Sequence, residues 1–142
     1  MQELSLQPAN QNAPPVAMML GRAGTAHWSA SFEFQASPMR LVVDVACRIS
    51  QPPGFVGSSY RIAAAPDDSH RFQDRIELAR NGNKAVFASA EQCDASRSLD
   101  DLYEFVISAL SQKPPATLRW KYIIAIETDD RESSVDKKTG RE

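Results

Sequence analysis

Alternation of apolar and polar side chains over residues 117–126 is the feature that most constrains the fold. The positions that share one face of this segment are all large and apolar: Leu118, Trp120, Tyr122, Ile124 and Ile126. A period of two is typical of a β-strand with one face in the core. Two positions on the other face, Ile123 and Ala125, are also apolar. We therefore expect a central strand, or one whose second face is also covered.

A helical period precedes this strand. Apolar residues recur at helix-like spacing at five positions: Leu99, Leu102, Tyr103, Val106 and Leu110. Ser98 can cap a helix, and Asp100 and Asp101 would lie near its positive end. Pro114–Pro115 cannot continue a helix. The pattern predicts an amphipathic helix that starts near Ser98 and packs on the sheet.

Two further segments, 28–35 and 39–49, alternate in the same way as residues 117–126. Trp28 opens the apolar face of the first segment, and Ser37–Pro38 separates the two. Short breaks of this kind join neighbouring strands. We predict an antiparallel hairpin.

Additional strands are predicted from turn signals. Residues 60–64 form a plausible third strand. Asn81–Gly82 is a strong hairpin signal, because both residues tolerate a positive φ. This turn would join strands within 71–80 and 84–91, although the register of the second arm is not fixed by the pattern.

Together these elements predict an α+β domain at residues 27–128. Its sheet has five to six strands, is mostly antiparallel, and packs on the single helix in the order β-β-β-β-β-α-β. A crossover from 84–91 to 117–127 through the helix would make those strands parallel and the sheet mixed. Residues 1–26 should be mostly disordered, with Val16–Leu20 as a short edge strand or docked patch. Residues 129–142 should be a disordered charged tail.

Composition excludes several classes of partner. The chain has 16 basic and 18 acidic residues and a formal charge of −2. Opposite charges alternate along the core, so we expect no nucleic-acid partner. Apolar runs fall short of the ~20 residues that span a membrane, so we expect no membrane insertion and a cytoplasmic location. Cys47 and Cys93 are too few for a disulfide framework; they are free thiols or form a single bridge.

Few motifs indicate chemistry. We expect no cofactor and no metal, because the sequence lacks a phosphate-binding glycine loop and ligand spacings such as Cys-x-x-Cys. Asp67 to His70 forms a dense polar cluster, which is either a site with His70 as base or a solvated turn. Cys93 would be a reactive thiol if it lay at a helix start. None of these residues is assigned as catalytic.

Basic side chains suggest one binding surface. Arg40 and Arg48 flank Asp44 on one face of a predicted strand, and Arg119 and Lys121 share the corresponding face of the last strand. Side by side, these strands would carry a basic stripe for an anionic ligand or partner. The alternative is a solvated face with cross-strand ion pairs.

A second candidate site lies at the loop 51–59, which holds the apolar residues Phe55 and Val56. With Tyr60, Trp28 and Trp120 they would line a cleft between sheet and helix, unless these aromatic residues are plain core. A cavity of several hundred Å3 under this loop would favour ligand binding.

Three functions follow, in order of expectation. The first is a non-enzymatic protein-interaction or adaptor module. Its half-apolar outer face, at Val42, Ala46, Ile123 and Ala125, would meet a partner or a second copy of the chain. The alternative is a small-ligand binding domain with the apolar cleft. A small enzyme is third, so enzymatic activity is not expected.

Overall fold

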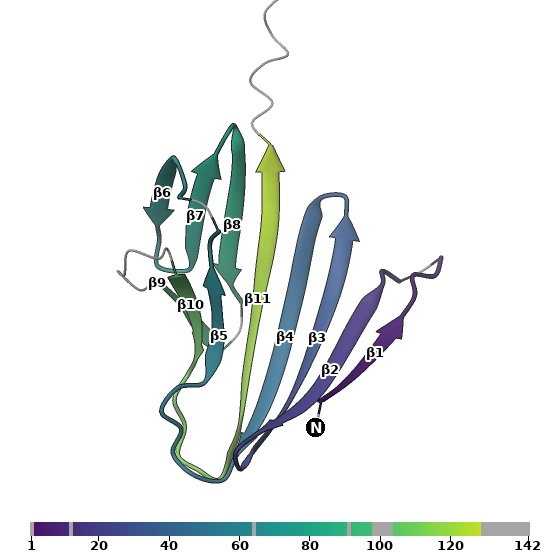
Figure 1. The fold of residues 1–142 in the computed structure, drawn as a ribbon, viewed down its shortest axis with the longest axis vertical. Helices are drawn as coiled ribbons and strands as arrows, with labels where there is room; N and C mark the ends of the chain where they lie inside the picture. The colour runs from purple at the N-terminus through teal and green to yellow at the C-terminus, as the bar shows by residue number, and fades with distance from the viewer. Residues whose placement is uncertain (1, 12, 64, 91, 98–103, 129–142) are drawn as a thin grey trace, which may run out of the picture.

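The computed structural model describes residues 2–11, 13–63, 65–90, 92–97 and 104–128, and in these residues every regular element is a β-strand (Figure 1). The large sheet has eight strands in this spatial order: β1 (Gln2–Gln7), β2 (Val16–Ala23), β3 (Ala26–Ala36), β4 (Met39–Ile49), β11 (Ala116–Thr128), β8 (Asn83–Ser89), β7 (Arg75–Arg80) and β6 (Asp68–Arg71). The small sheet has three: β5 (Gly57–Arg61), β10 (Glu104–Ala109) and β9 (Cys93–Arg97). All neighbouring strands are antiparallel.

The strongest alternating segments form the predicted strands. β3 and β4 pair as an antiparallel hairpin, with Ala30 opposite Val45 and Phe32 opposite Val43. The Asn81–Gly82 turn also joins its two strands, and both residues have positive φ values of 50° and 73°. Here the side-chain pattern and the turn residues agree on the same local structure.

The predicted α+β class is wrong, because no helix occurs in the described residues. Residues 104–109, placed in the helix, form β10 between β5 and β9. Ile107 of β10 is fully buried, although the helical pattern had assigned the inward positions to Val106 and Leu110. β-Branched residues and long-range pairing override the helical spacing here. The proposed cap at Ser98, Asp100 and Asp101 lies outside the described residues.

The predicted parallel crossover is also wrong. β8 and β11 are antiparallel neighbours, with Ile124 opposite Phe87. The chain between them passes through β9 and β10 of the small sheet rather than through one helix, so the right-handed crossover rule does not apply. The central position expected for the last strand is correct, because β11 lies between β4 and β8.

The N-terminal segment extends the sheet. Part of residues 1–26, for which mostly disorder was expected, forms β1 and β2, and β2 pairs with β3 along its edge. The Val16–Leu20 patch therefore lies in the plane of the sheet and does not cover its outer face. Most of the polar cluster Asp67 to His70, for which a solvated turn was one interpretation, lies in the edge strand β6.

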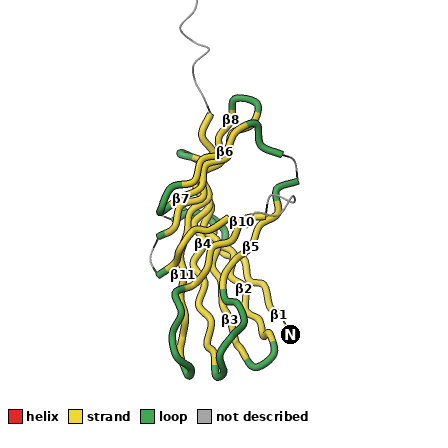
Figure 2. Tube along the Cα trace, turned by 90° about the vertical axis from the view of Figure 1, so that its left-hand side faces the viewer, coloured by secondary structure: helices red, strands yellow, loops and turns green. Residues whose placement is uncertain are grey.

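The small sheet covers one part of the large sheet and leaves the other part open (Figures 1 and 2). The inner face is the face of the large sheet that meets the small sheet. Its core joins Val43 and Trp120 to Ile107 of the small sheet. The hydroxyls of Tyr60 and Tyr122 are hydrogen-bonded, which ties β5 to β11. Neither β1 nor β2 contains a buried residue.

Candidate functional site

An apolar cavity of about 500 Å3 opens on the inner face, at the end of the large sheet where the β2–β3 turn lies. Its floor is formed by Trp28 and Ala30 of β3, Val45 and Cys47 of β4, and Trp120 of β11. The wall facing this floor is the β4–β5 loop, and the β2–β3 turn closes one side. The volume lies within the range of small-molecule sites, about 300–1,000 Å3.

Both tryptophans of the chain line the cavity. The Trp120 Nε1–H donates to Ser58 Oγ at 3.0 Å, and the Trp120 side chain is only 4% exposed. Trp28 is held by a close approach to β2: a Cβ at Gly21 would lie 2.3 Å from Cζ2 of its indole ring. Only glycine at position 21 leaves room for this indole.

The β4–β5 loop is placed by a second close approach. A Cβ at Gly57 would lie 2.3 Å from the Ile107 carbonyl oxygen and 2.7 Å from Cζ of Phe55. Phe55 is 56% exposed and lines both the large cavity and a hollow of about 200 Å3 on the other side of the loop. An exposed aromatic ring is therefore positioned at the cavity mouth.

The described lining residues include no charged side chain. Thr25, Ser50 and Gln51 supply polar atoms, and all three residues are exposed. Burial raises the pKa of the Cys47 thiol, which keeps it protonated and uncharged. Because an ionic ligand would have no counter-charge here, the cavity suits a neutral and mainly apolar molecule.

Four of the five predicted lining residues, Trp28, Phe55, Val56 and Trp120, lie around this cavity. Tyr60 is not among them. Its ring packs edge-on against Tyr122 with 6.0 Å between centroids, and desolvation together with the Tyr122 hydrogen bond raises its pKa far above the ordinary range. The expected helix does not form the second wall; the β4–β5 loop takes that place.

The four residues of the predicted basic stripe do not form one continuous group. Arg40 lies eight residues from Arg48 along β4, about 27 Å for an extended chain, and its Nε donates to Gln35. Arg119 forms two hydrogen bonds with Asp44, at 3.0 and 2.6 Å. Lys121 lies directly opposite Asp44 in the register. The hydrogen bond from Arg119 holds the pKa of Asp44 below its usual value.

The residues weighed for catalysis do not converge. His70 Nε2 lies 2.9 Å from Asp68 Oδ2 on the edge strand β6, and both side chains are more than 60% exposed. Asp67 instead accepts a hydrogen bond from the Asn81 N–H, which fixes the neighbouring turn. Cys93 is buried at the start of a strand rather than a helix, and its Sγ donates to the Lys121 carbonyl. Cys47 and Cys93 are both free.

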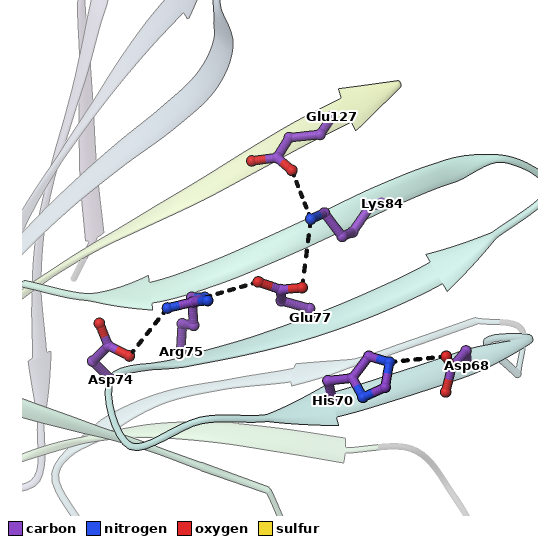
Figure 3. Close-up of polar contacts among 7 residues, drawn as sticks. All are labelled: Asp68, His70, Asp74, Arg75, Glu77, Lys84 and Glu127. Atoms are coloured by element: carbon purple, nitrogen blue, oxygen red, sulfur yellow. Dashed lines mark hydrogen bonds and ion pairs between the residues drawn. The ribbon is translucent and has the colours of Figure 1, made fainter. Parts of the chain in front are cut away.

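A chain of ion pairs crosses β7, β8 and β11 on the outer face, which is the face opposite the inner face (Figure 3). Glu77 lies at its centre, 2.8 Å from Arg75 Nε and 3.4 Å from Lys84 Nζ, and Lys84 also contacts Glu127 at 2.9 Å. The Arg75 hydrogen bond is the main cause that lowers the pKa of Glu77. These charges neutralise one another, so this network is structural.

In the described ranges, no three His, Cys, Asp or Glu side chains are grouped as a metal site would require, and no helix is long and apolar enough to cross a membrane. The chain matches no protein-family model, no curated protein and no solved structure.

Proposed function

We propose that this protein binds a small, neutral, mainly apolar molecule in the cavity between the large sheet and the β4–β5 loop. The supporting observation is the cavity itself: about 500 Å3, with both tryptophans of the chain in its lining and no charge among the described lining residues. Aromatic rings offer a ligand large apolar contact area at little entropic cost, since they have few rotatable bonds.

Tryptophan fluorescence reports directly on this site. We expect the neutral fluorophore N-phenyl-1-naphthylamine to gain emission on binding and to quench the tryptophans by energy transfer. Saturable binding supports the proposal. Absence of any fluorescence change up to the solubility limit of the probe contradicts it.

A matched pair of variants localises the probe. Ala26 lines the cavity, so Ala26→Leu should reduce its volume and weaken binding about tenfold or more. Ala46 lies on the outer face, opposite Ser29 and Arg119, so Ala46→Leu should leave binding unchanged. Thermal melts establish that both variants fold. Equal affinity in the two variants would place the probe elsewhere.

Strand β1 favours a second candidate function, an interaction module that pairs with a second copy of this chain. β1 is an edge strand of six residues without proline, lysine or arginine, the devices that usually protect an edge. Leu4 and Leu6 both point to the inner face, opposite Met19 and Ala17, and are 61% and 70% exposed.

If the β1 strands of two copies pair antiparallel around a two-fold axis, residues that face each other lie on the same face of the joined sheet. With Ser5 opposite Ser5 of the second copy, each Leu4 meets the other Leu6 and each Glu3 meets Gln7, so no like charges face each other. The two apolar inner faces would then join into one surface.

Light scattering after size exclusion tests this pairing. The wild type should approach twice the monomer mass as concentration rises, and Leu6→Lys should remain monomeric. Leu20→Lys, which changes an exposed leucine on the outer face of β2, serves as the control and should still dimerise. A monomer mass for the wild type at every concentration would exclude the dimer.

A further inference from the structure

A row of basic side chains crosses the outer face at the same end of the large sheet as the cavity. The register places Arg22 of β2 opposite His27 of β3, and His27 opposite Arg48 of β4. Thr117 of β11 follows opposite Arg48. All four residues are exposed. Of these residues only Arg48 belongs to the predicted basic stripe, because Arg22 and His27 become its neighbours only through the strand register.

The row brings two positive charges to one end of the sheet without an acid between them. Arg22 and Arg48 lie two strands apart, about 10 Å, and each is directly opposite His27. Within the described part of the chain, no acidic side chain forms an ion pair with Arg22, His27 or Arg48. Asp44, the acid farther along β4, is already bound by Arg119, and Glu3 lies only diagonally across from Arg22.

The geometry of the row suits an anion. Arg22 is anchored at the turn, because its Nε donates to the Gly24 carbonyl at 2.8 Å, which leaves its terminal nitrogens available. Arg48 presents a second planar guanidinium two strands away, and His27 between them can donate a ring N–H. Guanidinium groups bind the oxygens of phosphate or sulfate in pairs, with charge-assisted hydrogen bonds.

We infer that the Arg22–His27–Arg48 row is a binding site for a tetrahedral oxyanion, the phosphate or sulfate group of a ligand. The site is on the opposite face from the cavity and does not depend on the function proposed for it. It also differs from the predicted stripe, since Arg119 and Lys121 are associated with Asp44 and Arg40 lies at the other end of β4.

NMR titration tests the site with sodium phosphate and sodium sulfate, against sodium chloride at matched ionic strength. We expect saturable shifts of the Arg22 and Arg48 Nε–H and His27 ring signals, with a Kd on the order of 1 mM. The tighter of the two anions indicates the group that the natural ligand carries. Shifts that do not saturate, or that chloride reproduces, would show general screening and overturn the assignment.

Two variants separate binding from packing. Arg48→Gln should weaken phosphate binding about fivefold, the effect of losing one nearby charge in water. It should leave the unfolding midpoint in chloride nearly unchanged, because salt screens two exposed charges about 10 Å apart, and it should remove the additional stabilisation that phosphate gives the wild type. Arg80→Gln changes an exposed arginine at the end of β7 and should alter neither. An equal loss of stability for Arg48→Gln in both salts would mean that Arg48 is structural.

Discussion

The two halves of the large sheet carry similar inner faces and meet different surroundings. In the covered half, the residues of β4 and β11 pack against the small sheet, and Trp120 and Tyr122 are buried. In the open half, β1 and β3 continue the apolar alternation, yet Phe34 is 45% exposed and Leu4 is 61% exposed. Alternation therefore identifies the face of the sheet that can be buried, and the extent of the small sheet decides how much of that face is buried. The cavity lies at the boundary between the covered half and the open half.

Truncating one aromatic residue in each half gives the largest expected contrast. Trp120→Ala should lower the free energy of unfolding by about 3–5 kcal/mol, because it removes a buried side chain and its hydrogen bond to Ser58. Phe34→Ala should lower it by less than about 1 kcal/mol, because the ring is only half-buried. Urea denaturation measures both. Similar losses would mean that the open half is covered in solution.

A glycine pair tests the boundary between the halves. Gly21→Ala should lower stability by about 1–3 kcal/mol, because the new Cβ displaces the Trp28 indole from the cavity floor. Gly54→Ala, in the β4–β5 loop, meets no atom within 4 Å and should change stability little. Urea denaturation and tryptophan emission report the two effects. A Gly21→Ala emission spectrum like that of the wild type would contradict the close contact.

Substitutions in the Asp44–Arg119 ion pair on the outer face should change the free energy of unfolding least. The lowered pKa of Asp44 in the folded state means that its ion pair stabilises the fold above the unfolded pKa. This stabilisation, at most about 1 kcal/mol because Arg119 is largely exposed, is lost as pH falls through the folded pKa. Asp44→Asn and Arg119→Gln should therefore flatten the acid limb of a stability–pH curve to a similar degree. An unchanged limb in either variant would show that the pair contributes nothing.

Local signals predicted the elements whose neighbours lie close in sequence. The β3–β4 and β7–β8 hairpins follow from alternation and from their turns, and the central place of β11 follows from its two apolar faces. The helix was wrong because Val106 and Leu110 fit a helical period, whereas pairing with β5 and β9 decides the conformation. No local pattern encodes that pairing.

The candidate sites also contain residues that local sequence predicts and residues that it does not. Phe55 and Val56 could be predicted as lining residues because apolar side chains in an otherwise polar loop usually pack against something. Both line the cavity. Tyr60 was misassigned because an aromatic residue near a loop can equally serve the core. The Arg22–His27–Arg48 row depends on the registers of three strands. Alternation along one strand predicts which face a side chain is on, but it does not predict which residues of the neighbouring strands lie opposite it.

The most direct test of the half-covered sheet is the NOE pattern of residues 104–109. In the structure, the Val106 backbone lies opposite the backbones of Ser59 and Ser96, and Ile107 belongs to the core cluster that includes Val43 and Trp120, so NOEs of both kinds are expected. Helix-type sequential contacts through this segment, or Ile107 contacts to Phe34 in the open half, would contradict the account.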